Sequence, residues 1–339
     1  MQWRPRALLS TTVLKPTTYA LLALGLLAAV AMVLWQGVDL IAGTVGLVGW
    51  WFVGILAWYL LPILAMGLTL ALIFPPGAGL PFSTLTWINY VGGAVNALLP
   101  VASVGGELVK ALMLVQRGVP GPVAGAAVVT DKATQGVSQL ALGLFGVGAL
   151  IYLEAHAQLV TWLLGATLAF CVLLGAFFWA QGEGLFGMLA LRLERMMRGR
   201  VWWDIVGGAA QLDRALDTIY RRRRRVAGAC FWRVMTRLFL VAETWFIAQL
   251  MGHPIGWVEA LMLESLTQSV RGMAFVVPSG LGAQEGAFLL LGGLAGLPPE
   301  VALAVSLVKR GREVCACLPG LLALQWGAGR SLAAWRGGA

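Results

Sequence analysis

Two short stretches of the chain place a proline, glycines and a carboxylate inside an otherwise apolar run. Their residues are Pro100, Gly105, Gly106 and Glu107 in the first stretch, and Pro278, Gly280, Gly282, Gln284 and Glu285 in the second. Proline removes a backbone donor and glycine weakens a helix, so each stretch predicts a break in a hydrophobic segment that enters a membrane and turns back. The unpaired backbone groups and the carboxylate at each break need a polar cavity, in which a glutamate can bind a polar group or carry a proton.

The two stretches also share their spacing. In each of them the proline stands seven positions before the glutamate. A charged pair follows 24 and 25 positions after each glutamate, namely Asp131 and Lys132 in the first case and Lys309 and Arg310 in the second. This spacing predicts an internal repeat with an offset of 178 residues. We expect both glutamates to line one cavity, with the charged pairs on flanking helices.

Many ionisable residues fall within the predicted spans. Each costs roughly 2.5–3.5 kcal/mol on insertion scales, so such residues line a pathway or pair with one another. The predicted substrate-binding residues are Asn96, Glu107, Lys110, Asp131, Lys132, Arg271, Gln284, Glu285, Lys309 and Arg310. Further ionisable residues of the spans are Arg233, Arg237, Glu243, Glu264, Arg312 and Glu313. Together they comprise eight basic and six acidic side chains, which favours a headgroup with negative charge or hydroxyls. The alternative is a set of buried ion pairs that only hold helices together.

The composition is that of a polytopic membrane protein. Hydrophobic residues make up 59% of the 339 residues, charged residues make up 12%, and the mean hydropathy is +0.83, which no ordinary soluble domain shows. The net charge of +9 comes from arginines that lie between apolar segments, so we expect no nucleic-acid partner. The four cysteines lie in apolar runs without histidines at metal-ligand spacing, which predicts no metal and no disulfide. No cofactor is expected either.

The apolar runs predict an all-α polytopic fold that forms a single integral membrane domain over residues 1–339. A spanning helix needs about 20 mostly apolar residues. Six full spans are predicted at about 19–35, 45–74, 123–152, 159–180, 227–251 and 299–326. Two broken re-entrant segments are predicted at about 84–115 and 257–295.

Residues 181–226 form the one sizeable predicted excursion from the membrane. Apolar residues recur at helical spacing between Trp202 and Ile219, which predicts an amphipathic helix on the membrane surface. An unbroken basic run follows, made of Arg221, Arg222, Arg223, Arg224 and Arg225. We expect this run to anchor the chain against anionic lipids of the inner leaflet, and the alternative is a patch that gathers substrate.

The distribution of basic residues predicts the orientation of the chain. Loops assigned to the outside contain no lysine or arginine, whereas the loop 181–226 holds ten arginines, so both termini are expected in the cytoplasm. Under this topology the first broken segment enters from the cytoplasm and the second from outside. Repeat unit one, about 45–150, and repeat unit two, about 226–326, then have opposite orientations, which is the inverted-repeat design of many transporters.

The two motifs resemble those of the flippase-like membrane family, which includes the transmembrane part of lysylphosphatidylglycerol synthases. The resemblance is carried by residues 100–110, 130–132 and 278–286, and it covers about residues 19–326. It implies lipid translocation or lipid handling in a bacterial inner membrane. It also implies that Glu107, Asp131, Lys132 and Glu285 lie near the substrate headgroup. The run 108–118 is similar to the branch of this family that is associated with hopanoid biosynthesis.

The sequence thus predicts a lipid flippase or lipid transporter, whose substrate is a hopanoid or an anionic phospholipid. Transport would be passive or coupled to an ion gradient, since no nucleotide-binding motif is visible. A rival hypothesis is an intramembrane enzyme that modifies the headgroup of a hopanoid or polyprenyl lipid, although no catalytic motif is present. A third hypothesis is a scaffold for lipid synthesis that does not transport anything.

Overall fold

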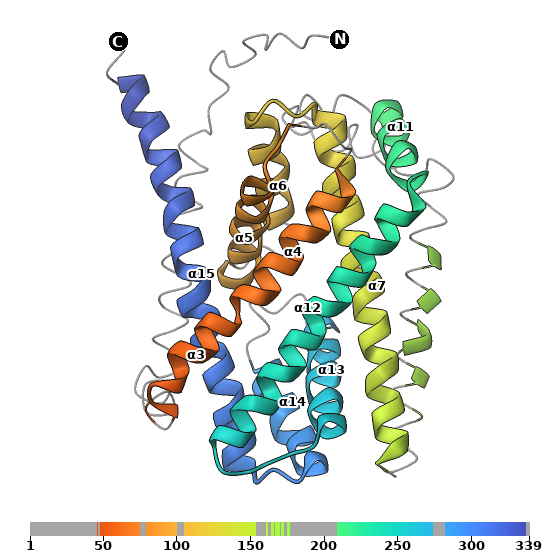
Figure 1. The fold of residues 1–339 in the computed structure, drawn as a ribbon, viewed down its shortest axis with the longest axis vertical. Coiled ribbons are helices and arrows are strands. Elements are labelled where there is room, and N and C mark those ends of the chain that lie inside the picture. Colours follow the sequence, from red (N-terminus) through yellow and green to blue (C-terminus); the bar gives the residue numbers. More distant parts are fainter. Residues whose placement is uncertain are drawn as a thin grey trace.

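The computed structural model describes residues 46, 48–74, 79–99, 105–153, scattered positions between 161 and 176, 209–273 and 282–336, with side chains up to residue 324. Every regular element within these ranges is helical, as the sequence predicts. The elements are α3 (Trp51–Trp58), α4 (Leu60–Ile73), α5 (Phe82–Leu98), α6 (Gly105–Gln116), α7 (Gly121–Tyr152), α11 (Ala209–Tyr220), α12 (Arg223–Leu250), α13 (Trp257–Met273), α14 (Ala283–Gly292), the short 3-10 helix η2 (Gly293–Ala295) and α15 (Pro299–Arg336) (Figure 1).

Proline and glycine set several of the helix boundaries. Pro122 lies in the first turn of α7 and Pro299 begins α15, where the missing N–H of proline has no partner to lose. Gly118 precedes α7 with a φ of 85°, a left-handed conformation that glycine adopts without strain. The turn before α7 is therefore explained by the residues in and next to it.

Two helical segments of the described part are long and apolar enough to cross a membrane by length and composition, Trp51–Ile73 and Gly121–Tyr152. Both coincide with predicted spans. The predicted span at 19–35 lies outside the described residues, and that at 159–180 is described only at scattered positions.

The two other predicted spans form α12, with 28 residues, and α15, with 38 residues. Both are long enough to span, but they carry too many charges to count as apolar. In α12 the buried charged residues are Arg233 and Glu243, and in α15 they are Lys309, Arg310 and Arg312. These charged side chains of α12 and α15 thus face other helices. The mean hydropathy of each helix therefore understates how apolar the rest of its surface is.

The segment 84–115, predicted to be broken, is not one helix. Its two parts, α5 and α6, pack against each other. A Cβ on Gly106 would lie 2.0 Å from the carbonyl oxygen of Gly92, and the side chain of Lys110 also lies against Gly92. Since later residues of α6 lie beside earlier residues of α5, the two helices are antiparallel. The predicted break residue Pro100 lies outside the described residues.

A second pair of packed helices, α13 and α14, follows the same pattern. Arg271 near the end of α13 donates a hydrogen bond to Gln284 at the start of α14, so this pair also turns back on itself. Gly282 stands directly before α14 with a φ of 72°, a left-handed conformation that glycine adopts without strain. The other predicted break residues, Pro278 and Gly280, lie outside the described residues.

The N-terminal and C-terminal halves of the chain interleave. α4 and α12 pack side by side and run diagonally across the molecule (Figure 1). α7 of the first half packs against α13 of the second, and α15 of the second half packs against α5 of the first. Each half therefore supplies a long helix that covers the hairpin of the other.

Two apolar clusters hold these helices together at opposite ends. One contains Met262, Leu263 and Phe288 of α13 and α14, and the other contains Leu70 and Leu114 of α4 and α6. Burial of side chains of this size contributes about 1.5–3 kcal/mol each. The charged residues described below lie among the same helices.

α11 contains the last part of the predicted apolar stripe, and the part before residue 209 lies outside the described residues. Leu212, Leu216 and Ile219 are buried in the second cluster, and the helix packs against α7. The apolar stripe of α11 is therefore covered by protein. Burial raises the pKa of the Asp213 carboxyl in this helix above its ordinary value.

Candidate functional site

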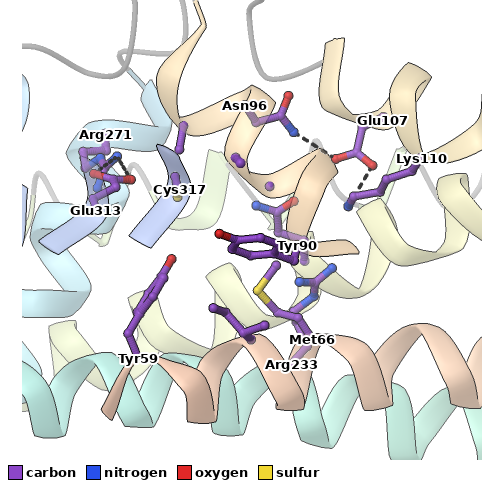
Figure 2. Close-up of a pocket in the computed structure, with 15 residues that line it drawn as sticks. Tyr59, Met66, Tyr90, Asn96, Glu107, Lys110, Arg233, Arg271, Glu313 and Cys317 are labelled. Atoms are coloured by element: carbon purple, nitrogen blue, oxygen red, sulfur yellow. Dashed lines mark hydrogen bonds and ion pairs between the residues drawn. The ribbon is translucent and has the colours of Figure 1, made fainter. Parts of the chain in front are cut away.

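A polar cavity of about 230 Å³ lies between the two helical hairpins. Side chains from both halves of the chain point into it (Figure 2). Its polar and charged lining residues are Tyr59, Tyr90, Asn96, Glu107, Lys110, Gln135, Arg233, Arg271 and Glu313. Apolar parts of the wall come from residues such as Met66 and Ala94.

The first charged network lies on one side of the cavity and joins α6, α7 and α12. Glu107 pairs with Lys110 at 3.2 Å and with Lys132 at 3.5 Å. The Nζ of Lys110 also donates to Oδ2 of Asp131 at 2.9 Å, and Asp131 forms a further ion pair with Arg233. Two carboxylates thus hold three cations, and the first network carries a net positive charge.

Asn96 connects this network to the start of α6. Its Oδ1 accepts a hydrogen bond from the backbone N–H of Gly106 at 2.8 Å, and its Nδ2 donates to Oε1 of Glu107 at 3.3 Å. The first N–H groups of a helix have no partner within the helix, so Asn96 satisfies one of them from α5. The absence of a side chain at Gly106 permits this close approach.

The second charged network lies on the opposite side and joins α13, α14 and α15. Arg271 pairs with Glu313 at 3.2 Å, and Arg310 pairs with Glu313 at 3.5 Å and with Glu285 at 3.2 Å. Arg271 also donates to Oε1 of Gln284 at 2.9 Å. Here two carboxylates balance two guanidinium groups.

Two further buried ion pairs support the cavity without lining it. Arg312 donates to both oxygens of Glu243 at 2.6 and 2.9 Å, and its guanidinium lies 4.0 Å from the ring centroid of Tyr59, a cavity residue. Lys309 pairs with Glu264. The first pair joins α12 to α15 and the second joins α13 to α15, so both connect helices of the second half of the chain.

Three buried polar atoms of the two networks lack a hydrogen bond within the described chain. They are Oε2 of Glu107, Oε2 of Glu285 and Nε of Arg233. The Oε2 atom of Glu107 lies within ion-pair distance of Lys110 but does not have hydrogen-bond geometry. Buried polar groups are nearly always satisfied. Of the three residues, Glu107 and Arg233 line the cavity, where a polar ligand could reach them, whereas Glu285 does not.

The structure separates the predicted site residues into three groups. Those that line the cavity are Asn96, Glu107, Lys110 and Arg271. Those that adjoin it through the two networks are Asp131, Lys132, Gln284, Glu285 and Arg310. Lys309 belongs to the separate pair with Glu264. We expect Glu107 and Glu285 in one cavity, but only Glu107 lines it. Glu285 is connected to the cavity residue Glu313 through Arg310.

Some cavity residues were not among the predicted site residues. Arg233 and Glu313 were recognised as ionisable residues of spans, and their position on buried helix faces was the available signal. Tyr59 and Tyr90 carried no such signal, because aromatic residues in an apolar run are typical of the membrane interface. Tyr90 donates its hydroxyl hydrogen to the carbonyl oxygen of Ala316 in α15.

Within the described ranges, no group of three or more His, Cys, Asp or Glu side chains is placed to hold a metal ion. What the arrangement offers is a cavity whose opposite walls carry carboxylates that each contact more than one cation. A group that enters with charges or hydroxyls can compete for these partners. Such competition allows binding and release without a covalent step.

The family model for the lysylphosphatidylglycerol synthase TM region matches residues 20–318. No curated protein and no solved structure shows a significant match to the chain. The family match does not distinguish the hopanoid-associated branch. With a match over most of its length, the chain belongs to the family of lysylphosphatidylglycerol synthase transmembrane regions, and it is a membrane protein with a role connected to membrane lipids.

Proposed function

We propose that this protein is a lipid flippase or lipid transporter of the bacterial inner membrane. The observation that carries the proposal is the polar cavity, because it is walled by charged side chains from both halves of a chain in a membrane family related to lipids. A lipid headgroup would enter this cavity while its tails remain in the bilayer. The substrate would be a hopanoid or an anionic phospholipid.

The helix boundaries support an internal repeat. α6 and α14 begin at residues 105 and 283, and α7 and α15 begin at residues 121 and 299, so both pairs are separated by 178 positions. Ion pairs repeat at the same offset, because Glu107 pairs with Lys132 and Glu285 pairs with Arg310. Packing is also reciprocal, since α7 covers α13 and α15 covers α5.

From this repeat we infer two units of opposite orientation, with re-entrant hairpins formed by α5–α6 and α13–α14. Transporters of this design alternate between two states in which one unit rocks against the other around a fixed site. The networks suit such a motion, because Glu107 and Glu313 each contact two cations. A carboxylate can keep one partner while it releases the other. Both termini and the basic run Arg221–Arg225 would then lie on the cytoplasmic side.

A second candidate function is supported by one specific observation. Two carboxylates, Glu107 and Glu313, line the same cavity, as an enzyme that modifies a headgroup would require. Both carboxylates belong to ion-pair networks, and the sequence contains no catalytic motif. We therefore favour transport.

Reconstituted vesicles can test transport directly. Fluorescent lipids with several different headgroups are placed in one leaflet, with and without an imposed pH gradient, and their appearance in the other leaflet is followed by quenching. Wild-type protein should move at least one of them. Glu107→Gln should slow this movement by about tenfold, since a hydrogen bond to a charged group contributes about 1.5–3 kcal/mol.

The control is Arg117→Gln, which removes a charge from an exposed residue between α6 and α7 and should leave the rate unchanged. Vesicles in which no labelled lipid moves, with any headgroup or gradient, would overturn the proposal. Mass spectrometry of the same vesicles addresses the alternative. A new lipid species that requires Glu107 or Glu313 would establish an enzyme instead.

A further inference from the structure

The first part of α15 is held firmly to the other helices of the second half. Lys309, Arg310, Arg312 and Glu313 form ion pairs with residues of α12, α13 and α14. Ser306 also accepts a hydrogen bond from α14. The following residues 314–324 include no charged side chain, so no ion pair can hold them. α15 therefore has an anchored first part and a later part that lacks such anchors.

Pro319 lies inside α15, beyond the anchored part. In an α-helix the N–H of this position donates to the carbonyl oxygen of Cys315, and proline has no N–H to donate. Long helices bend at breaks of this kind. Gly320 follows directly and makes the backbone more flexible. α15 thus has a point at which its later part can turn relative to its anchored part.

The later part of α15 packs against α5, a helix without any charged residue. The two helices share an apolar cluster of buried residues, namely Ala94, Val95, Leu98, Leu99, Cys317 and Leu321. Ala94 and Cys317 also line the cavity. Leu318 and Leu322 of α15 are exposed instead, as residues in contact with lipid are. The contact between α5 and α15 therefore separates the cavity from the surroundings of the protein.

Tyr90 of α5 joins this contact to the break in α15. Its hydroxyl donates a hydrogen bond to the carbonyl oxygen of Ala316, which is the α-helical acceptor for the N–H of Gly320. A Cβ on Gly320 would lie 2.9 Å from Cε1 of Tyr90, so the aromatic ring packs against the backbone there. Tyr90 lines the cavity as well (Figure 2). It thus contacts α15 on both sides of Pro319 from the wall of the cavity.

We propose that Pro319 is a hinge about which the later part of α15 moves away from α5, and that Tyr90 holds the two helices together in the closed state. The proposal rests on the proposed function, because a lipid with its headgroup in the cavity and its tails in the bilayer needs an opening between two helices. Tyr90 is a positioning residue in this scheme. It acts on α15 and need not touch the lipid.

The contact between α5 and α15 is suited to such an opening. Neither α5 nor the segment 314–324 contains a charge that would lose its partner when the helices separate. Separation of α12 from α15 would instead break the buried pair of Glu243 with Arg312. Breaking a buried ion pair is far more costly than losing one neutral hydrogen bond.

The reaction of Cys317 with N-ethylmaleimide measures the opening, because this residue is only 4% exposed in the closed structure. The full-length protein is used in detergent, with Cys171, Cys230 and Cys315 replaced by serine. Tyr90→Phe should speed the reaction about threefold to tenfold, the range expected for the loss of one hydrogen bond. Tyr152→Phe, at an exposed tyrosine that ends α7, is the matched control and should leave the rate unchanged.

Pro319→Ala tests the hinge itself. It restores the missing N–H, so it should slow the reaction of Cys317 by at least about threefold and slow lipid movement in reconstituted vesicles. Pro299→Ala, at the exposed first residue of the same helix, should change neither rate, because an N–H in the first turn has no partner within the helix. Unchanged reactivity of Cys317 in both Tyr90→Phe and Pro319→Ala would overturn the proposal.

A second reporter distinguishes a local movement from a general loss of stability. Ser306→Cys, combined with Cys317→Ser, places the thiol at a buried position in the anchored part of α15. Tyr90→Phe should accelerate the reaction at residue 317 and not at residue 306. Equal acceleration at both positions would show that Tyr90 supports the whole structure and would overturn its role in holding the contact closed.

The reactivity of Cys317 does not depend on transport, so the hinge and the proposed function can fail separately. If Cys317 responds to Tyr90→Phe and Pro319→Ala as expected but no lipid moves in vesicles, the hinge stands and the proposed function is wrong. If Pro319→Ala moves lipids as fast as wild type, transport stands and the role of the hinge in it is wrong.

Discussion

Glu107 of α6 and Lys132 of α7 form an ion pair in which 3.5 Å separates Oε1 from Nζ. The side chain of Lys132 is 38% exposed, whereas that of Lys110, the other partner of Glu107, is only 4% exposed. Glu107 is therefore shared between two lysines. Lys110 is buried and also pairs with Asp131, whereas Lys132 is partly exposed. The two lysines should differ in what their removal costs.

Lys110→Gln should destabilise the protein by about 3–5 kcal/mol, because it leaves Glu107 and Asp131 short of a buried partner. Lys132→Gln should cost less, about 1 kcal/mol, because the side chain of Lys132 is partly exposed and solvent weakens its ion pair with Glu107. Thermal unfolding of the two variants in detergent measures the difference. Equal losses would show that the partly exposed Lys132 is as important for stability as the buried Lys110.

Asp131 and Arg233 should be energetically coupled. Asp131→Asn leaves Arg233 with a buried, uncompensated charge. Arg233→Gln removes one of the two cations that pair with Asp131. In a double-mutant cycle we expect the double variant to lose less than the sum of the single variants, with an interaction of about 0.5–3 kcal/mol. Strict additivity in denaturation experiments would contradict the direct ion pair.

Gly106→Ala should disrupt the hairpin of α5 and α6. Its Cβ would lie 2.0 Å from the carbonyl oxygen of Gly92, and a backbone atom cannot move aside as a side chain does. We expect little folded protein in size-exclusion chromatography. Gly93→Ala is the matched control, because its Cβ would meet Met66 at an ordinary 3.9 Å. Similar yields of both variants would rule out the close approach.

Asp213→Asn should stabilise the protein at neutral pH. Burial raises the pKa of the Asp213 carboxyl in the folded state, so the charged form costs stability once the pH exceeds the pKa of the unfolded chain. The advantage of the variant should therefore be present at neutral pH and should vanish at pH values below that unfolded pKa. Melting temperatures over a pH series measure it. Asp217→Asn, at an exposed residue of the same helix, should show no such gain.

The sequence predicted the helices well, because the signals for them are local. The predicted segments 123–152 and 227–251 correspond to α7 and α12 within a few residues. The separation of α5 from α6 was predicted from Pro100, Gly105 and Gly106. In the structure Gly105 and Gly106 begin α6, and Pro100 lies outside the described residues. These effects need no knowledge of the remaining fold.

The partners of the charged residues were harder to predict, because they depend on how distant helices are rotated about their axes. Glu285 and Glu313 lie on neighbouring helices and share Arg310, yet only Glu313 lines the cavity. Tyr59 lines the cavity, and Arg312, 253 positions later in the chain, packs against its ring. No spacing along the chain specifies contacts between residues this far apart.

The ion pair between Asp131 and Arg233 joins residues that are 102 positions apart. At synthesis rates of about 5–20 residues per second, the arginine is made about 5–20 seconds after the aspartate. During this interval the carboxylate of a nascent α7 has Lys110, made 21 positions earlier, as its partner. Asp131 therefore has one counterion from its own half of the chain, Lys110, as well as the later Arg233.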